Sequence, residues 1–357
     1  MDSFAELGSL VRDTARCRSL GALFSLAAAS TLTGVLIACG GGGGDAPAPP
    51  PAPTPAPAPA PTPSAPIAAQ LTVPTPVGYD ADRLAAFNRL NEIRLSAGLG
   101  MLAQSTEMDQ AAQAHAEWMV ANDSFTHEEG VGTVDFTGTD WVRRDEAFGY
   151  VPVEGGEMIS ADGSGLASVD SLVNTAYHRA VMLAFEPVDL GIGWSGLTAA
   201  SFSDPLVVDM ASPGTDATRG LGQAAQSAIK GVAIWPLDGA HDVPVRLGLE
   251  TPNPVPTQDV LTLGTPVSIT VAEARTIFSD SFVMTNSSTG AVMSVQVLTN
   301  QNDPNFLVPE SFIAAIPLTA LAPSTTYVVV FSGRVVERVS GDSEAISRMW
   351  SFTTAAQ

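Results

Sequence analysis

A proline-rich tract divides this chain of 357 residues and limits where it can fold. Residues 46–66 consist almost entirely of Pro and Ala, with a few Thr and Ser. Because proline has no backbone N–H and a fixed φ, such a run favours polyproline II over helix or sheet. At about 3.1 Å per residue, the tract reaches roughly 65 Å. We therefore expect a semi-rigid spacer, with the compact structure on its C-terminal side.

The segment before this tract has the pattern of a signal peptide. Three arginines precede an apolar run over residues 20–38, which ends in Leu-Ile-Ala directly before Cys39. A basic region, an apolar region and small residues at the end are typical of a cleaved secretory leader. The alternative is an uncleaved membrane helix, because the apolar run is nearly long enough to span a bilayer. The glycine run at 40–44 and the proline tract favour a tether after the cysteine, and hence the cleaved leader over residues 1–38.

The Leu-Ile-Ala-Cys sequence resembles the lipobox of bacterial lipoproteins. The resemblance implies cleavage before Cys39, acylation of its thiol and attachment to a membrane through the lipid. Because Gly40 follows the cysteine in place of Asp, the resemblance also implies an outer-membrane location in the cell envelope. The other cysteine, Cys17, would leave with the leader, so the mature chain has no internal disulfide and depends on packing for stability.

Composition narrows the classes of partner. The chain has 37 Asp and Glu against 16 Lys and Arg, which gives a net charge of -21. Such a charge repels phosphate backbones, so we expect no nucleic-acid partner. The length predicts two folded domains, and a hydrophobic content of 45% is enough to give each a core.

The first folded domain is predicted over residues 79–213, after a lipidated tether of residues 39–78. Asp80 can cap a helix that ends at Gly98, and Ser105 can cap a second helix. Further helices are predicted over 140–148 and 166–175, and strands over 151–160, 188–194 and 205–210. This mixture of helices and short strands indicates an α+β sandwich.

The order of motifs in this domain resembles bacterial members of the CAP superfamily, the SCP-like domains. The motifs are Asn-Arg-Leu-Asn-Glu-Ile-Arg at 88–94, Ala-Ala-Gln-Ala-His-Ala-Glu-Trp-Met at 111–119, Ser-Phe-Thr-His at 124–127, Gly-Glu-Met-Ile at 156–159, Tyr-His-Arg at 177–179 and Gly-Ile-Gly-Trp at 191–194. The resemblance covers about residues 80–213. It implies an α-β-α sandwich with a cleft that gathers two histidines and acidic residues.

Carried over to this chain, the resemblance places His127, Glu157 and His178 in that cleft. Two neutral imidazoles and a carboxylate suit a divalent metal such as zinc, with an open position for water or a ligand. Alternatively, Glu157 accepts a proton while a histidine orients a substrate. Met158 stands where the family usually has Asn, and this departure weakens the case for both metal binding and hydrolysis.

The second acidic residue of the family's cleft has no clear equivalent here. Asp170 and Asn174 are the nearest polar candidates in the sequence. His115 lies on the apolar side of the second predicted helix. We expect it to be a core histidine bonded to a backbone carbonyl, because buried polar groups generally have a partner.

A second domain is predicted over residues 231–357, after a linker of residues 214–230. Short strands between Gly, Pro, Asn and Asp clusters predict an all-β sandwich. The Leu-x-Pro-x-Thr-x-Tyr turn at 321–327 and the Trp-Ser-Phe-Thr-Thr strand at 350–354 resemble bacterial Ig-like domains. Four aromatic residues are expected to supply its core: Trp235, Tyr327, Phe331 and Trp350.

Three acidic residues of this second domain could suggest a calcium-binding site. Asp238, Asp242 and Asp280 lack the ligand spacing of a calcium loop. We therefore expect them to be solvated residues in turns.

Three functions remain open from the sequence. The first is a non-enzymatic CAP domain that binds a lipid, glycan or peptide and is spaced from the membrane by the proline-rich stalk. The second is a metal-dependent hydrolase that uses His127, Glu157 and His178. The third is an adhesive or structural protein that acts through its Ig-like domain. The missing Asn and second acid favour the first and third.

Overall fold

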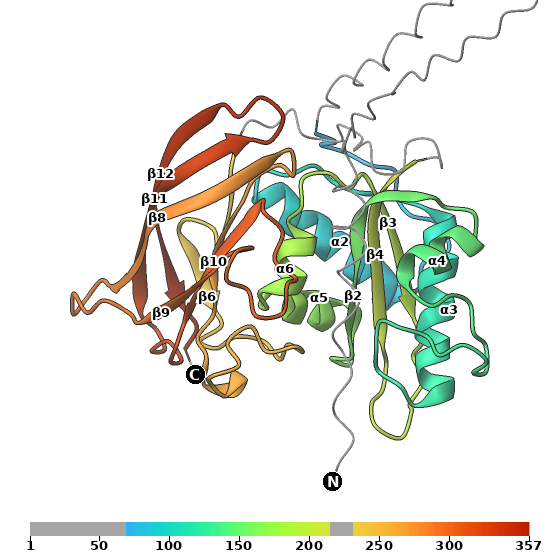
Figure 1. Ribbon diagram of the computed structural model, residues 1–357. Helices are drawn as coiled ribbons and strands as arrows, with labels where there is room; N and C mark the ends of the chain where they lie inside the picture. Colours follow the sequence, from blue (N-terminus) through green and yellow to red (C-terminus); the bar gives the residue numbers. More distant parts are fainter. Residues whose placement is uncertain (1–68, 215–230, 357) are drawn as a thin grey trace, which may run out of the picture.

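The computed structural model describes residues 69–214 and 231–356. The predicted signal peptide, Cys39 and most of the tether lie outside these residues, as does nearly all of the linker. Within the described ranges, no helix combines the length and the apolar character needed to cross a bilayer. The described chain forms two bodies, a mixed α/β body before the linker and an all-β body after it, and the two lie against each other (Figure 1).

The first body is a three-layer α-β-α sandwich, as predicted (Figure 1). Its central sheet has the strand order β1-β3-β4-β2, with β1 parallel to β3 and the other pairs antiparallel. The strands are β1 (Ala103–Gln104), β2 (Pro152–Ser160), β3 (Asp189–Trp194) and β4 (Leu206–Pro213). One face of the sheet is covered by α3 (Thr106–Asn122) and α4 (Trp141–Ala147), and the other by α2 (Ala81–Ser96), α5 (Gly165–Val173) and α6 (Tyr177–Met182).

The helices begin where side chains can accept hydrogen bonds from free backbone N–H groups. The carboxylate of Asp80 accepts from the backbone N–H of Arg83 at 2.8 Å, and this contact starts α2. Ser105 caps α3 in the same way through its hydroxyl oxygen. Because these residues satisfy N–H groups that a helix leaves open, the predicted starts of both helices agree with the structure.

Two glycines of β3 let helix α3 approach the sheet. A Cβ at Gly191 would meet the backbone of Met108, and a Cβ at Gly193 would meet the backbone of Ala112. Both neighbours belong to α3, so no flexible side chain can move aside. The Gly-Ile-Gly-Trp motif is thus explained by close helix-to-strand packing.

This packing makes Gly193 intolerant of a side chain. Gly193→Ala is expected to lower the free energy of unfolding by about 2–3 kcal/mol, because the added methyl group forces α3 away from the sheet. Urea denaturation measures the change. Ser195→Ala is the control, since the Ser195 hydroxyl has no hydrogen-bond partner within the described residues. Equal stability of the two variants would contradict the packing role of Gly193.

The second body consists of two four-stranded sheets, which confirms the all-β prediction. Their strand orders are β5-β7-β10-β9 and β6-β12-β11-β8. The first sheet contains β5 (Ala233–Trp235), β7 (Val267–Thr270), β9 (Val295–Leu298) and β10 (Phe312–Pro317). The second contains β6 (Ala240–Val243), β8 (Arg275–Asn286), β11 (Thr326–Glu337) and β12 (Ser343–Thr354), and η1 (Val260–Thr262) lies in the connection between β6 and β7.

Three of the four predicted aromatic residues form the core of this body. Tyr327, Phe331 and Trp350 are buried in one apolar cluster. Trp235 differs from the prediction, because it is only partly buried and packs against the apolar core of the first body. The difference arises because β5 is an edge strand at the boundary between the two bodies.

The boundary between the bodies is itself packed and polar contacts cross it. The buried guanidinium of Arg179 donates to the carbonyl oxygen of Pro266 at 2.6 Å. The hydroxyl of Tyr177 donates to the carboxylate of Asp303 at 2.7 Å. Ala176, Tyr177 and Ala180 of the first body share an apolar cluster with residues of the second. Helix α6 therefore belongs to the first body but is also packed against and hydrogen-bonded to the second.

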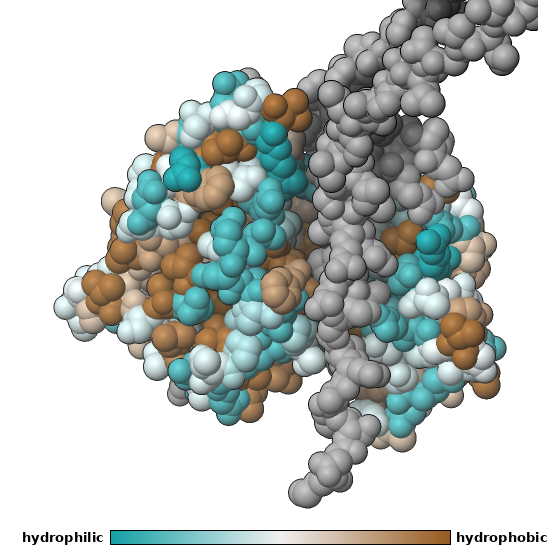
Figure 2. Space-filling view, in the orientation of Figure 1, coloured by the Kyte–Doolittle hydropathy of each residue, from teal (hydrophilic) through white to brown (hydrophobic). Residues whose placement is uncertain are grey.

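The visible surface of the second body is mixed in character. Figure 2 shows hydrophilic and hydrophobic residues interspersed over this face. Polar residues in strand and turn positions agree with the half-exposed strands of an antiparallel sheet.

Candidate functional site

The predicted cleft residues meet at the edge strand β2. Glu157 lies on β2, and its Oε1 is 2.7 Å from Nδ1 of His127, which belongs to the loop between α3 and α4. His178 lies in the first turn of α6, and its ring centroid is 6.4 Å from that of His127. Residues far apart in the sequence are thus brought together from both helical layers.

Glu157 is buried and both of its carboxylate oxygens are occupied. Its Oε1 accepts from His127, and its Oε2 accepts from the guanidinium of Arg144 at 2.5 Å. The Arg144 side chain is fully buried and also donates to the backbone carbonyl of His127 at 3.1 Å. Burial would raise the pKa of Glu157, but the charges of Arg144 and His115 and the hydrogen bond from His127 hold it well below its ordinary value. Glu157 is therefore an ionised carboxylate that orients His127.

His178 is held in place by residues of both bodies. Its Nδ1 lies 3.1 Å from the Thr175 hydroxyl and 3.5 Å from Oε1 of Glu250, which belongs to the second body. The Glu250 carboxylate also accepts from the backbone N–H groups of Ala176, Tyr177 and His178, at 2.9, 2.6 and 3.3 Å. Ala176, the N-cap residue of α6, has no side chain that could do this. A residue of the second body thus caps the helix that carries His178.

These contacts fix the tautomers of both imidazoles. The ionised Glu157 can only accept, so Nδ1 of His127 carries the proton. The Thr175 hydroxyl donates to the carbonyl of Leu172, so it too accepts from His178 Nδ1. In the neutral form of either ring the lone pair is therefore on Nε2, the arrangement in which a second group orients a ligating histidine.

This geometry suits a metal site with two histidine ligands better than the predicted site with three ligands. The described residues contain no group of three or more His, Cys, Asp and Glu side chains arranged to hold a metal ion. Glu157 uses its oxygens on His127 and Arg144, whereas Nε2 of His127 and Nε2 of His178 are free of such contacts in the described structure. Zinc binding at these residues stays a prediction, in which the two histidines would be ligands and Glu157 would orient one of them.

His115 is the core histidine that the sequence predicted. It is fully buried, with Nδ1 3.0 Å from Glu129 and Nε2 2.9 Å from the carbonyl oxygen of Thr126. Glu129 follows His127 in a polar stretch of sequence, yet its side chain is buried and accepts from the backbone N–H of Thr137 at 2.6 Å. His115 and Glu129 thus hold the loop that carries His127 through contacts with Thr126 near its start and Thr137 near its end.

The two polar candidates for the missing acid lie elsewhere. Asp170 pairs with Arg89 at 2.7 Å on the exposed side of the helices. The side chain of Asn174 donates to the carbonyl of Arg246. Among the described residues, neither side chain forms a hydrogen bond or ion pair with His127 or His178.

Two buried aspartates, Asp145 and Asp209, interact electrostatically with Arg144 and Glu157. Asp209 lies opposite Glu157 in the β2–β4 pairing, and Asp145 follows Arg144 in α4. Neither carboxyl group has a hydrogen-bond partner within the described residues. Burial and the charge of Glu157 raise the pKa of Asp145 to about 8, and burial with the charges of Asp145 and Glu157 raises the pKa of Asp209 well above its ordinary value.

These raised pKa values predict a pH dependence of stability. An unfolded aspartate has a pKa of about 3.9, so the folded state binds protons more tightly at these groups. The stability that the folded protein gains from protonation of these groups is complete below about pH 4 and is lost as the pH rises toward about 8. Asp209→Asn is expected to match the parent protein at about pH 4 and to exceed its stability at about pH 8.

Urea denaturation at several pH values tests this expectation. Asp135→Asn is the control, because Asp135 is exposed and its left-handed backbone conformation tolerates Asn. A stability gain for Asp209→Asn that does not change with pH would contradict protonation of the buried pair.

A family model matches most of the first body. Residues 87–207 match the model of the CAP family, described as the cysteine-rich secretory protein family. An outer surface protein from Borrelia burgdorferi is similar in structure, with 16% sequence identity over 37% of this chain and 93% of that one and a TM-score of 0.33. An extracellular protein with an SCP domain from Bacillus anthracis str. Ames is 22% identical over 35% of this chain and 38% of its own, with a TM-score of 0.30. Curated protein sequences give no match.

The matched segment differs from the family description in one respect. The cysteines of this chain are Cys17 and Cys39, so residues 87–207 contain none. The sandwich is held by its apolar clusters and buried polar contacts instead. The family match, the three-layer sandwich and the order of the motifs lead to one conclusion: this chain carries a CAP domain in its first body.

Proposed function

We propose that the protein is a cell-envelope lipoprotein whose CAP domain binds a ligand without catalysing a reaction. The supporting observation is the double engagement of Glu157 by Arg144 and His127. A carboxylate with a strongly lowered pKa and two donors is a poor general base, because proton transfer needs a base whose pKa lies near the working pH. The metal-dependent hydrolase is therefore the weaker alternative.

The two histidines supply the recognition surface of this proposal. The His127 side chain is 32% exposed and the His178 side chain is 15% exposed, so both are accessible to a ligand from solvent. Nε2 lone pairs accept hydrogen bonds from hydroxyl, amide or ammonium groups, which lipid headgroups, glycans and peptides all carry. The ligand class thus remains that of the sequence-based hypothesis: a lipid, glycan or peptide of the envelope.

Binding assays with point variants test the CAP-domain proposal. The whole chain is offered phosphatidylethanolamine vesicles, soluble peptidoglycan fragments and a pool of unstructured peptides. Binding to one probe is expected to fall in His127→Ala and in His178→Ala, but not in His241→Ala, an exposed histidine of β6. If a probe is hydrolysed and a chelator abolishes this hydrolysis, the hydrolase is favoured instead. If neither His127→Ala nor His178→Ala weakens binding, the proposal is rejected.

The anchoring part of the proposal rests on the sequence of the leader. Acylation at Cys39 would place the CAP domain beyond the proline-rich stalk, with the second body, resembling an Ig-like domain, beside it. Cys39→Ser is expected to abolish palmitate incorporation and to release the protein from the membrane fraction. Inner-membrane retention of the parent protein on fractionation would contradict the outer-membrane location.

A further inference from the structure

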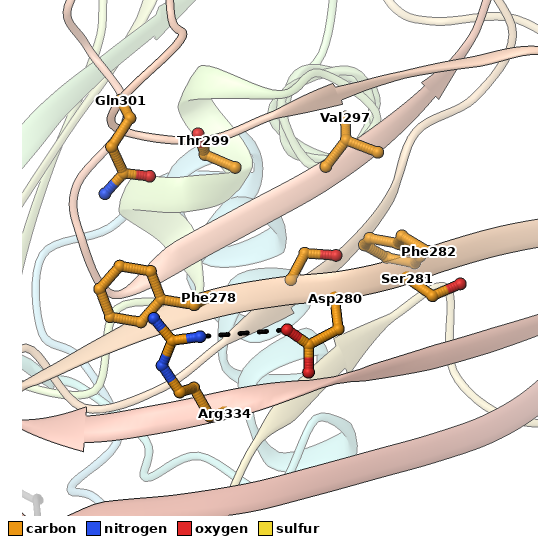
Figure 3. Close-up of a pocket in the computed structure, with 9 residues that line it drawn as sticks. Phe278, Asp280, Ser281, Phe282, Val297, Thr299, Gln301 and Arg334 are labelled. Carbon is orange, nitrogen blue, oxygen red and sulfur yellow. Dashed lines mark ion pairs between the residues drawn. The ribbon is translucent and has the colours of Figure 1, made fainter.

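A pocket lies between the edge strands of the two sheets in the second body (Figure 3). Its volume is about 500 Å³, which falls within the range of small-molecule sites. Strands β8 and β9 each end the hydrogen-bonding order of their sheet, so the pocket opens where the sandwich is not closed. It lies apart from the CAP site and uses none of its residues.

A β-bulge sets the position of Asp280 at this pocket. In the pairing of β8 with β11, Ser281 is opposite Ser332 and Ser279 is opposite Gly333, so Asp280 is the extra residue. A bulge redirects a side chain and increases the local twist. A Cβ at Gly333 of β11 would meet the backbone oxygen of Phe278, so the partner strand needs glycine opposite the bulge. The Asp280 side chain is 66% exposed, as expected for a solvated acid, and it lines the open pocket beside Arg334 (Figure 3).

The guanidinium of Arg334 is oriented by an aromatic ring. It lies 4.3 Å from the centroid of Phe278 and 3.9 Å from Oδ1 of Asp280. The second distance is longer than a hydrogen bond, so the carboxylate does not use up the donors of the guanidinium. Stacking on Phe278 limits the rotamers of Arg334 and prepares its planar donor group for a ligand.

The opposite rim adds a hydroxyl and an amide beside apolar walls. Thr299 and Gln301 follow β9 and lie across the pocket from Phe278 and Arg334 (Figure 3). The guanidinium of Arg334 donates hydrogen bonds, the carboxylate of Asp280 accepts them, and the carboxamide of Gln301 can do both. Val297 supplies an apolar wall.

We propose that this pocket binds a neutral saccharide unit. A sugar ring has an apolar face of C–H groups and an edge of adjacent hydroxyls that both donate and accept, which matches apolar walls with planar polar groups on two rims. A peptide added to the edge of β8 fits less well, because the bulge at Asp280 interrupts the regular hydrogen-bonding edge that strand addition requires. The proposal is independent of the ligand at His127 and His178.

The test uses the whole chain and an immobilised panel of neutral hexose and N-acetylhexosamine oligomers, followed by titration of the oligomer that binds. Arg334→Ala and Asp280→Asn are each expected to weaken binding about tenfold or more, since each removes charge-assisted hydrogen bonds. Arg348→Ala is the matched control, because it removes an exposed positive charge from β12 of the same sheet. Thermal unfolding verifies that the variants remain folded.

Three outcomes would overturn the proposal. The first is the absence of binding to the panel at millimolar oligomer. The second is saccharide binding that is unaffected by Arg334→Ala and lost in His178→Ala, which would assign the sugar to the CAP site. The third is binding to a parallel panel of extended peptides and to no saccharide, which would make the pocket a peptide groove.

Discussion

Arg144→Met is expected to lower the free energy of unfolding by about 3–5 kcal/mol, because it leaves a buried carboxylate without its cation. The Arg144 side chain is fully buried and donates to Glu157 and to the backbone carbonyl of His127. Methionine keeps much of the apolar stem but none of the donors. Glu157 then faces the raised-pKa aspartates Asp145 and Asp209 with less positive charge nearby. Urea denaturation near neutral pH measures the loss.

The neighbouring arginine provides a matched control. Arg143 is 59% exposed and pairs with Glu146 one helical turn away, so Arg143→Met should change stability by no more than about 0.5 kcal/mol. The double variant Arg144→Met with Glu157→Gln should recover part of the loss, because it removes both charges together. Equal stability of Arg144→Met and Arg143→Met would show that the guanidinium does not stabilise Glu157.

Local features of the CAP domain were predictable because they follow from short-range chemistry. Asp80 and Ser105 are capping residues at helix starts, and their side chains do accept from the first turns of α2 and α3. Tyr327 and Phe331 alternate with outward residues along β11 and lie in the core of the second body, where the same reasoning applies. In each case the signal is a spacing of about two to four residues, which the sequence shows directly.

Arg144 was missed although the sequence held a signal for it. Three residues separate it from Trp141 and four from Phe148, so a helical period turns it toward the same side as these aromatic residues. Composition argues the other way, because arginine is rarely buried unless it is paired. Its partner Glu157 lies on another element, and only the folded sheet and helix α4 bring the two together. A charged residue on an apolar helix face is the pattern that would have pointed to it.

Trp235 and Glu250 were missed for a different reason. Both lie on the boundary between the two bodies, and sequence patterns treat each predicted domain as a separate core. Glu250 is 72 residues from His178, and its partners are backbone N–H groups, which leave no trace in side-chain identity. The sequence predicted two modules on a stalk, whereas the structure shows that the second body completes the surroundings of a site residue in the first.

Glu250→Ala is the prediction that follows from this shared structure. The carboxylate accepts from three backbone N–H groups at the start of α6, and its side chain is fully buried. Alanine leaves the N–H groups of Ala176 and Tyr177 buried without an acceptor. Loss of a helix cap and of charge-assisted hydrogen bonds should lower the free energy of unfolding by about 2–4 kcal/mol. Urea denaturation measures this change, and Glu344→Ala, with a side chain that is 70% exposed, should lower it by no more than about 1 kcal/mol.

Two local measurements separate a positioning role of Glu250 from a general loss of stability. Hydrogen exchange should accelerate most at the amides of Ala176, Tyr177 and His178, because these donate to the carboxylate. The ring signals of His178 should shift in NMR spectra, while those of the exposed His241 stay in place. Glu250→Gln keeps one acceptor oxygen and should therefore lie between the parent protein and Glu250→Ala in all three measurements. If exchange rose uniformly over the CAP domain and the His178 signals did not move, Glu250 would stabilise the boundary without orienting His178, and the CAP site would not depend on the second body.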